Sequence, residues 1–382
     1  MNIKLNFNLF RQWLIDHKTD YQSILANKPY CIAISTDKID NRDLIMFKYS
    51  QIDSDFSNPF VKLCRGLILD ANTFEPVSFP FVKFHNAGEP NADDIDWKSA
   101  SILEKVDGSL IKIVKIGDQL LVSTNGTIDA AKAPIAEQIG CPFKTFDDIV
   151  QYCFRYAAPE GVCYMDFEEG FTYMFELVSP YTRVVIPYKT PELYFLGLRN
   201  NLTFEEELPY SHPLALKFKT PHKFDLHTLD ECLAATKAMS WDEEGYVVCD
   251  ANFNRVKVKS PSYVAAHNLK GNGVLSYARA IELVRSNEID EICSYFEEFR
   301  PALEECKDRF WKLVEDTENA WNDYLKIDAS LPTRKDKALW ITKNFKMPGI
   351  AFGLLDKKIT SIRDFFMTCP TEKLLKYLGY KE

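Results

Sequence analysis

The spacing of apolar and polar positions divides the chain into two regions. Up to about residue 260, short apolar runs alternate with polar positions, a pattern typical of β-strands that bury one face. Beyond residue 260, apolar positions recur every three to four residues, which is typical of amphipathic helices. The sequence therefore predicts a strand-rich region followed by a helical region.

The strand-rich region contains two predicted hairpins. One joins Leu110–Lys115 to Leu120–Ser123 through a Gly-Asp turn, and the other joins Gly245–Cys249 to Val256–Ser260. The same pattern predicts further strands at Tyr173–Val178, Val184–Tyr188 and Leu193–Leu198, and helices at Leu9–Asp16, Ala131–Gln138, Phe146–Ala157 and Asp230–Ala238.

The second region reads as a series of helices joined by short connections. Leu331–Arg334, which contains a proline, and Gly349–Gly353 are predicted to be connections. A chain of this length is too long for one compact core, so we expect two domains, residues 1–260 and 261–382. The helices of the second domain are predicted at Val274–Val284, Ile289–Phe299, Ala302–Leu325, Lys335–Asn344 and Thr360–Leu378.

The composition is that of a soluble globular protein, with 46% hydrophobic and 26% charged residues. No window approaches the roughly 18 uncharged apolar residues that a membrane span needs, so we expect no membrane partner and a cytoplasmic location. The ten cysteines form no C-x-x-C and the six histidines no H-x-H or H-E-x-x-H. A zinc site is therefore not expected, and most cysteines are predicted to be buried thiols in a reducing compartment.

The net charge of −9 argues against a nucleic-acid partner held by bulk charge. Acidic and basic residues balance after residue 260, so the whole excess of negative charge lies in residues 1–260. Any binding of RNA or DNA must therefore come from a local basic patch, and it must weaken with salt.

Lys105-Val106-Asp107-Gly108 is the segment most informative about chemistry. A lysine followed by x-Asp-Gly is the signature of enzymes whose lysine amine attacks the α-phosphate of a nucleotide and forms a covalent lysyl-nucleotide. The same four residues also describe an ordinary solvated turn. A lysine amine with a pKa of about 10.4 is a poor nucleophile at neutral pH, and nearby cations both lower that pKa and neutralise phosphates. If Lys105 is a nucleophile, other cations should therefore converge on it.

Three segments carry charged residues that could meet Lys105. Strand alternation places Arg255, Lys257 and Lys259 on one face of their strand, where two lysines ~7 Å apart could clamp phosphates. A solvated strand face is the alternative. Glu244 stands at the start of the preceding strand. Glu176 lies inside an apolar strand, where an unpaired charge is costly, so such a residue is more often functional or paired.

The order of these segments along the chain resembles the covalent nucleotidyltransferase superfamily of ligases and capping enzymes. Within it, the chain is similar to the bacteriophage RNA ligase 1 family over about residues 45–265. Most other relatives carry an arginine two residues after the motif glycine, where this chain has Leu110. The RNA ligase 1 family has instead an upstream arginine and an upstream lysine, matched by Arg65 and Lys83. It also continues into helices rather than into an oligonucleotide-binding barrel.

The resemblance implies an α+β fold: a nucleotidyltransferase (ATP-grasp-like ligase) catalytic domain of antiparallel sheets with flanking helices, followed by an all-α C-terminal domain. It also implies a role for each matched residue. Lys105 would be adenylylated, Arg65, Lys83, Lys257 and Lys259 would hold the phosphates, Glu176 would bind the ribose, and Glu244 would help to place the metal.

Two further assignments have an ordinary alternative. Tyr49 matches an aromatic segment that packs on the nucleotide, and a tyrosine in an ordinary strand is as good a reading. Asp290 matches a metal-linked aspartate just beyond the catalytic domain, and a solvated helix acid is the better reading.

The chain also departs from the family pattern. After the hairpin that follows the motif, the family often shows K-x-K-G-S-I, whereas this chain has Ser123-Thr124-Asn125-Gly126-Thr127-Ile128. The missing lysines put in doubt any phosphate or RNA contact assigned to this strand. No P-loop and no G-x-G-x-x-G occur, so strand-borne cations would have to hold the nucleotide.

The resemblance implies a monomeric ATP-dependent RNA ligase that uses Mg²⁺, for which Mn²⁺ can substitute. It would join 5′-phosphate and 3′-hydroxyl ends of single-stranded RNA in RNA repair, with cleaved tRNA as one candidate, in the host cytoplasm if phage-encoded. The helical domain would then select the RNA. The alternatives are another covalent nucleotidyltransferase, such as a DNA ligase or a capping enzyme, and a non-catalytic RNA-binding relative.

Overall fold

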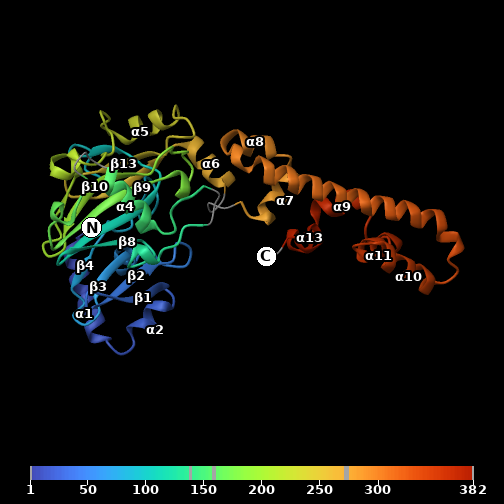
Figure 1. The fold of residues 1–382 in the computed structure, drawn as a ribbon, viewed down its shortest axis with the longest axis horizontal. Coiled ribbons are helices and arrows are strands. Elements are labelled where there is room, and N and C mark those ends of the chain that lie inside the picture. The colour runs from blue at the N-terminus through green and yellow to red at the C-terminus, as the bar shows by residue number, and fades with distance from the viewer. Residues whose placement is uncertain (1, 137–139, 157–160, 271–274, 381–382) are drawn as a thin grey trace. The chain divides into compact units, whose positions relative to one another are not determined.

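The computed structural model in Figure 1 describes residues 2–136, 140–156, 161–270 and 275–380. The chain divides into two compact units, Met1–Ala265 and Ala266–Glu382. All strands of the described residues lie in the first unit, and the regular structure of the second unit is helical. The first unit is therefore α+β and the second is α.

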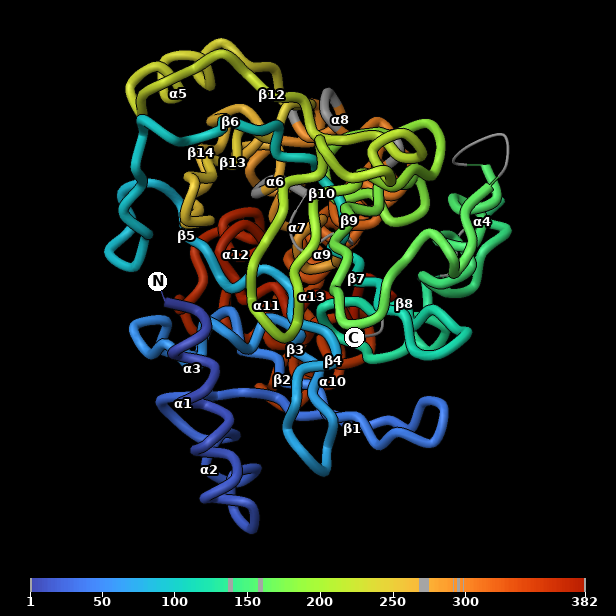
Figure 2. The backbone as a smooth tube through the Cα atoms, turned by 90° about the vertical axis from the view of Figure 1, so that its left-hand side faces the viewer, coloured from blue at the N-terminus to red at the C-terminus, as the bar shows by residue number. Residues whose placement is uncertain are grey.

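The first sheet of the first unit has four antiparallel strands in the order β1-β2-β3-β4. Phe7, Phe10 and Leu14 of α1 bury their side chains in the same apolar core as Phe47 of β2 and Leu67 of β3. Figure 2 shows this sheet and its helices together at one end of the unit. The elements are α1 (Ile3–Asp16), α2 (Tyr21–Ala26), β1 (Ile32–Ile39), β2 (Arg42–Tyr49), α3 (Pro59–Leu63), β3 (Arg65–Asp70) and β4 (Pro76–Ser78).

The second sheet has five strands in the order β11-β10-β9-β7-β8, and these neighbours pair antiparallel. Helix α4 (Phe146–Tyr156) packs on it through Ile149, Val150 and Phe154. The strands are β7 (Ser109–Ile116), β8 (Gln119–Thr124), β9 (Phe171–Val178), β10 (Glu192–Asn200) and β11 (Glu206–Glu207).

The third sheet also has five strands, in the order β12-β6-β13-β14-β5, and α5 (Leu229–Thr236) packs on it through Cys232. The motif Lys105–Gly108 forms the whole connection between β6 of this sheet and β7 of the second sheet. The motif therefore lies where the two sheets meet. The strands are β5 (His85–Asn86), β6 (Ser101–Glu104), β12 (Lys223–Phe224), β13 (Gly245–Cys249) and β14 (Arg255–Lys259).

The second unit is built around the 28-residue helix α9 (Arg300–Ile327), which buries Phe310, Leu313 and Val314. No helix among the described residues is long and apolar enough to cross a membrane. The boundary between the units falls within α6 (Pro261–Lys270). The remaining helices are α7 (Tyr277–Ser286), α8 (Ile289–Tyr295), α10 (Arg334–Asn344), α11 (Pro348–Leu355), α12 (Ile362–Thr368) and α13 (Thr371–Leu378).

Both predicted hairpins are confirmed, as β7–β8 and β13–β14. The prediction of a strand at Val184–Tyr188 is wrong, because the N–H groups of Val185 and Ile186 donate to the carboxylate of Asp107 instead of a neighbouring strand. The helix predicted at Ala131–Gln138 is only a short 3₁₀ turn at Ala130–Lys132, and residues 137–138 lie outside the described residues.

Two predictions in the helical region are also wrong. Gly349–Gly353 is not a connection but part of α11, which begins at Pro348, where a proline is tolerated because its missing N–H has no partner in the first turn. Thr360–Leu378 is not one helix but two, α12 and α13, separated at Pro370. The ends of two other predicted helices, Ala157 and Val274, lie outside the described residues.

Candidate functional site

A pocket between the second and third sheets encloses about 180 Å³. Its walls come from β6, β7, β9, β10, β13 and β14, and β3 of the first sheet adds one arginine. One part of the lining is apolar, and the other part concentrates positive charge. The charged lining residues are Arg65, Lys105, Arg255, Lys257, Lys259, Glu104 and Glu176.

The amine of Lys105 is held by a buried carboxylate. Its Nζ lies 2.7 Å from Glu244, which also pairs with Lys259 at 3.1 Å and is only 4% exposed. The backbone N–H of Lys105 donates to the carbonyl of Gly245 at 2.9 Å, which fixes the motif at the edge of β13. Glu244 thus joins the candidate nucleophile to the strand of the phosphate-clamp candidates, and this ion pair must open before the amine can attack an electrophile.

The other two defined positions of the motif have structural reasons. A Cβ on Gly108 would overlap the carbonyl oxygen of Leu177, because the backbone there runs directly against β9. Asp107 is buried, and its carboxylate accepts hydrogen bonds from the N–H groups of Val185 and Ile186 and from the hydroxyl of Tyr263, the last at 2.7 Å. Asp107 therefore anchors the motif to a loop and to helix α6.

Strand β14 presents its charged residues to the pocket, as the alternation predicts. Val256 and Val258 lie in the apolar core with Cys232, while Arg255, Lys257 and Lys259 line the pocket. Burial, reinforced by Lys83, Lys105, Arg65 and Lys259, lowers the pKa of Lys257 to about 7. Such crowding of like charges is unfavourable in a resting protein and becomes favourable when an anion enters.

Arg65 and Lys257 both lie against the ring of Phe84, at 5.1 Å and 5.6 Å from its centre. Phe84 lines the pocket and was not predicted as a site residue, although it directly follows Lys83. An aromatic ring attracts cations at such distances without neutralising their charge. Phe84 therefore keeps these cations available to a ligand.

Lys83 and Tyr49 lie beside Arg65 and not among the residues that line the pocket. The amine of Lys83 is 5.3 Å from the centre of the Tyr49 ring and donates to Gln51 at 2.9 Å. Burial and the adjacent Arg65 lower the pKa of Lys83. Burial raises the pKa of Tyr49, against the opposing charge of Arg65. To contact a nucleotide in this pocket, both side chains would have to move, or the ligand would have to extend beyond the pocket.

Glu176 lines the pocket from β9, directly beside Leu177, against which Gly108 packs. Burial raises the pKa of Glu176 to about 7, Lys105 opposes this effect, and Glu244 adds to it. Glu176 and Glu244 therefore differ in their partners. Glu244 is paired with lysines, whereas no salt bridge within the described residues involves Glu176.

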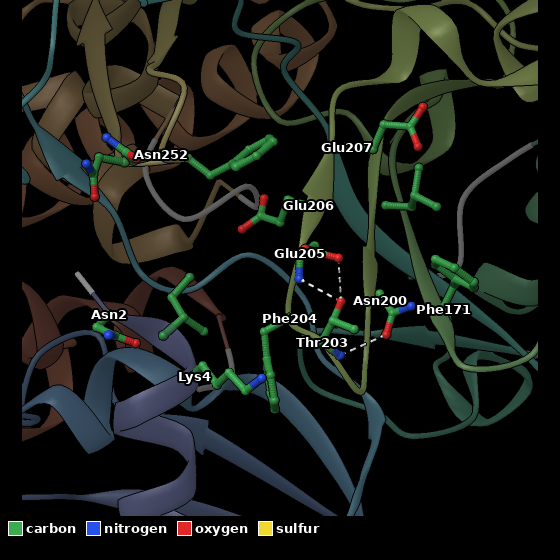
Figure 3. Close-up of a pocket in the computed structure, with 14 residues that line it drawn as sticks. Asn2, Lys4, Phe171, Asn200, Thr203, Phe204, Glu205, Glu206, Glu207 and Asn252 are labelled. Carbon is green, nitrogen blue, oxygen red and sulfur yellow. Dashed lines mark hydrogen bonds between the residues drawn. The ribbon is translucent and has the colours of Figure 1, made fainter.

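A buried ion cluster at the start of β14 was not predicted. Arg255 pairs with Glu206 at 2.7 Å, Glu206 also pairs with the fully buried Arg199, and the Arg255 guanidinium stacks 4.3 Å from the centre of the Phe81 ring. Glu206 points toward the β13–β14 turn, away from Glu207 (Figure 3). The cluster fixes the end of the strand that carries Lys257. Arg199 and Glu206 are seven positions apart and face each other across β10 and β11, but Arg255 and Phe81 are distant from both in sequence. No local pattern marks these residues as partners.

The larger cleft drawn in Figure 3, of about 940 Å³, lies on the other side of this cluster. Its charged lining residues are Lys4, Glu205, Glu206 and Glu207. Three carboxylates against one amine disfavour a polyphosphate. The smaller pocket is therefore the better candidate for an anionic ligand, although it has less room.

The hairpin strand that lacks the family's lysines runs beside another lysine. Lys112 of β7 pairs with Ser123 across the hairpin, and its amine approaches Gly66, which packs against the backbone of Asn125. The amine of Lys112 on β7 therefore lies close to the hairpin strand from which the family's lysines are missing. Lys112 was not predicted as a site residue, and its apolar surroundings in Leu110–Val114 are the signal that marks it as unusual.

Asp290 belongs to the second unit, where its carboxylate is exposed and pairs with Arg300 at 3.0 Å. The other candidate residues all belong to the first unit. Among the residues that the structure describes, no group of three or more histidine, cysteine, aspartate or glutamate side chains could hold a metal ion.

Comparisons with known proteins agree on one family. The sequence profile of the RNA ligase family matches residues 63–263. A putative bifunctional polynucleotide kinase/RNA ligase of Autographa californica nuclear polyhedrosis virus is 29% identical over 278 residues, which are 68% of this chain and 38% of that one. A putative RNA ligase of Thermovibrio ammonificans is 26% identical over 293 residues, covering 72% and 71% of the two chains.

Among solved structures, an archaeal ATP-dependent RNA ligase aligns with a TM-score of 0.42 and 13% identity, covering 98% of this chain and 90% of that one. The match to the viral protein spans well under half of that protein's length. The family profile covers more than half of this chain, and its range includes Arg65, Lys105, Glu176, Glu244 and Lys259. The chain therefore belongs to the RNA ligase family.

Proposed function

We propose that this protein is an ATP-dependent RNA ligase that joins 5′-phosphate and 3′-hydroxyl ends of single-stranded RNA. The observation that carries this proposal is the position of the Lys105 amine in one pocket with four other cations, Arg65, Arg255, Lys257 and Lys259. A nucleophilic lysine among cations suits attack on a polyphosphate. Membership of the RNA ligase family supports the choice of RNA ends as substrate.

The reaction would have three displacements at phosphorus. In the first, the Lys105 nitrogen forms a bond to the α-phosphorus of ATP as pyrophosphate leaves, and the ammonium gives up two of its three protons. In the second, an oxygen of the RNA 5′-phosphate attacks the same phosphorus and the lysine leaves. In the third, the RNA 3′-hydroxyl attacks the 5′-phosphate and AMP leaves. Catalysis of such steps is mostly positioning and charge stabilisation, which strand-borne lysines can supply.

The charged residues divide this work between them. Lys257, Lys259 and Arg65 would bind phosphate oxygens, and Glu176 would accept a hydrogen bond from the ribose. Glu244 would release Lys105 when the amine becomes the nucleophile, because Lys259 remains available as its second partner. The apolar walls of the pocket, including Leu103, would receive the base.

Mg²⁺, with Mn²⁺ as a substitute, fits the donors of the site. Magnesium is usually held by one or two carboxylates together with substrate phosphates and water, and Glu244 and Glu176 are two carboxylates at the pocket. The ion would neutralise charge on the phosphates. Asp290 would serve only if the second unit contributes to the same site.

The direct test is incubation with ATP labelled on the α-phosphate, followed by sealing of a 5′-phosphorylated single-stranded RNA. We expect the protein to become labelled by ATP. We also expect the RNA to be converted into circular or longer products. Label from GTP instead would indicate a capping enzyme, and sealing restricted to nicked DNA duplex would indicate a DNA ligase. Absence of label from any nucleotide would indicate a non-catalytic RNA-binding protein. A nicked tRNA anticodon loop tested beside an unstructured RNA would examine the proposed role in tRNA repair.

The binding of ATP is expected to depend on pH through Lys257. The pKa of this lysine is lowered to about 7, so its ammonium carries charge below that pH and loses it above. The wild-type protein should therefore bind an ATP analogue with a methylene α–β bridge more tightly than Lys257→Met does. The difference in affinity should be largest at about pH 6 and should disappear by about pH 8.5. Calorimetry with both proteins at each pH measures this difference, and the ionisation of the ligand cancels. A constant ratio of affinities would contradict the assignment.

We propose that the helical unit selects the RNA, and that transfer of AMP to Lys105 does not need it. A chain that ends after Ala265 should still form lysyl-AMP and should discriminate less between RNA substrates, since RNA is recognised largely by shape. A chain that ends after Ser260 is the matched control. It lacks Tyr263, whose hydroxyl holds Asp107, and it should label more slowly. A soluble chain of 265 residues without lysyl-AMP would overturn this division and favour Asp290 as a metal ligand.

A further inference from the structure

Lys112 is a buried lysine that the proposed reaction does not use. Its side chain is fully enclosed, and lysines are almost never fully buried unless they are paired. Within the described residues Lys112 forms no salt bridge with a carboxylate, and its amine donates to the carbonyl of Gly66 at 2.5 Å. Burial, reinforced by Arg65, lowers the pKa of Lys112 to about 7. Burying an amine without a carboxylate partner is energetically unfavourable, so another contact of Lys112 must compensate for it.

The backbone at Gly66 supplies that contact. Strands β2 and β3 pair as Phe47 with Leu67 and as Lys48 with Arg65, so Gly66 is an extra residue in β3. Its φ of +76° lies in the left-handed region that glycine tolerates. This arrangement is a β-bulge, which disrupts the ladder locally and turns the neighbouring side chain in a new direction. The neighbouring side chain is Arg65, which lines the pocket.

The amine of Lys112 sits where it can hold this bulge. It reaches the Gly66 carbonyl from β7 of another sheet, and a Cβ on Gly66 would lie 2.9 Å from it and 2.9 Å from the Cα of Asn125. The backbone of the bulge at Gly66 therefore has little space in which to change conformation. Because the carbonyl and the peptide of Gly66 are fixed, the direction in which Arg65 leaves the strand is fixed as well.

We propose that Lys112 is a positioning residue for Arg65, which it aims at the phosphates by holding the Gly66 carbonyl of the bulge. The inference rests on the proposed function, since Arg65 acts there as a phosphate ligand. Lys112 itself is enclosed and would not touch the nucleotide. Lys112 would act only through Arg65, whereas the lysines of β14 would bind the phosphates themselves.

A double-mutant cycle tests this relation in the 382-residue chain with labelled ATP and Mg²⁺. Lys112→Met removes the donor and keeps the length of the side chain, and kcat/KM for lysyl-AMP formation should fall on the order of 10²-fold, as for a misplaced binding group. In an Arg65→Ala background the same substitution should cost no more than about 2-fold, because there is no arginine left to aim. Lys115→Met, on the same strand and outside the pocket, is the matched control and should be unchanged.

The outcomes separate this inference from the proposed function. If the wild-type protein is not labelled from ATP, the proposed function fails. If it is labelled and Lys112→Met is labelled as fast, or loses the same factor in both backgrounds, the positioning role is overturned. Should Lys112→Met not fold, Lys112→Leu, which also removes the donor, replaces it in the cycle, with the same criterion. Failure of both variants to fold would show a role in stability alone and would also overturn the proposal.

Discussion

Replacing Lys105 with alanine is expected to abolish self-adenylylation by ATP. Its amine is the one in the K-x-D-G segment, and it faces the pocket with Glu244 as its partner. The covalent bond to AMP cannot form without this nitrogen, so the loss should be complete rather than partial. Gel detection of protein-bound label from α-labelled ATP measures the effect.

The same variant should still seal RNA that already carries a 5′-adenylate, because that step needs no new lysyl-AMP. This second assay shows that the protein is folded and that only the first step is lost. Lys115→Ala is the control, since it lies outside the pocket on the next strand. Normal labelling of Lys105→Ala would remove Lys105 from the mechanism.

Lys257→Ala and Lys259→Ala should each lower the rate of lysyl-AMP formation by roughly 10²-fold or more, the cost of removing one charged transition-state donor. Both amines line the pocket from the same face of β14. Lys259→Ala should have a second effect, because it leaves Lys105 as the remaining partner of Glu244 and tightens the resting ion pair. Single-turnover kinetics at saturating ATP measures these rates.

Arginine at either position should not restore the full rate, since a planar guanidinium does not replace a compact ammonium at a tight phosphate site. Partial recovery of ATP binding with little recovery of rate is the expected pattern. If both alanine variants form lysyl-AMP at close to the wild-type rate, β14 is a solvated strand whose charges do not serve the reaction.

The arrangement of charge explains how a protein with a net charge of −9 can offer an anion site. Five cations line one pocket, and the neighbouring acids are placed so that they do not cancel them all. Lys105 and Lys259 share one carboxylate, that of Glu244. Arg255 is paired with Glu206 in a buried cluster that also contains Arg199. Breaking such a cluster by removing one partner is strongly destabilising, whereas an apolar replacement of the whole cluster is often tolerated. Arg255 therefore belongs to the support of the site.

Local patterns of the sequence were sufficient for several elements of the first unit. The strands of both hairpins, and the common direction of Arg255, Lys257 and Lys259, follow from a period of two, which each strand imposes on its own residues. The helix α9 follows in the same way from a period near four. The K-x-D-G segment and the order of charged segments indicated the family without any tertiary information.

Local patterns failed where a distant residue decided the conformation. Val184–Tyr188 reads as a strand, yet its N–H groups bind Asp107, which lies nearly 80 residues earlier in the chain. Gly349–Gly353 reads as a turn, yet it is helical because its apolar side chains, such as Ile350, are buried in the second unit. Tertiary contacts override weak local preference in both places.

The sequence by itself determined the nucleophile candidate and the face of β14, because each depends on residues that are neighbours in the chain. It also indicated the family, because the order of motifs along the chain can be read without the fold. Only the tertiary structure decided that Glu244 holds Lys105, that Asp107 anchors the motif to Tyr263, and that Lys112 holds the bulge at Gly66. The contacts of Lys105, Asp107 and Lys112 join residues separated by 139, 156 and 46 positions. A periodic pattern carries no information about such pairs, because the packing of whole sheets against each other, not the preference of any segment, brings them together.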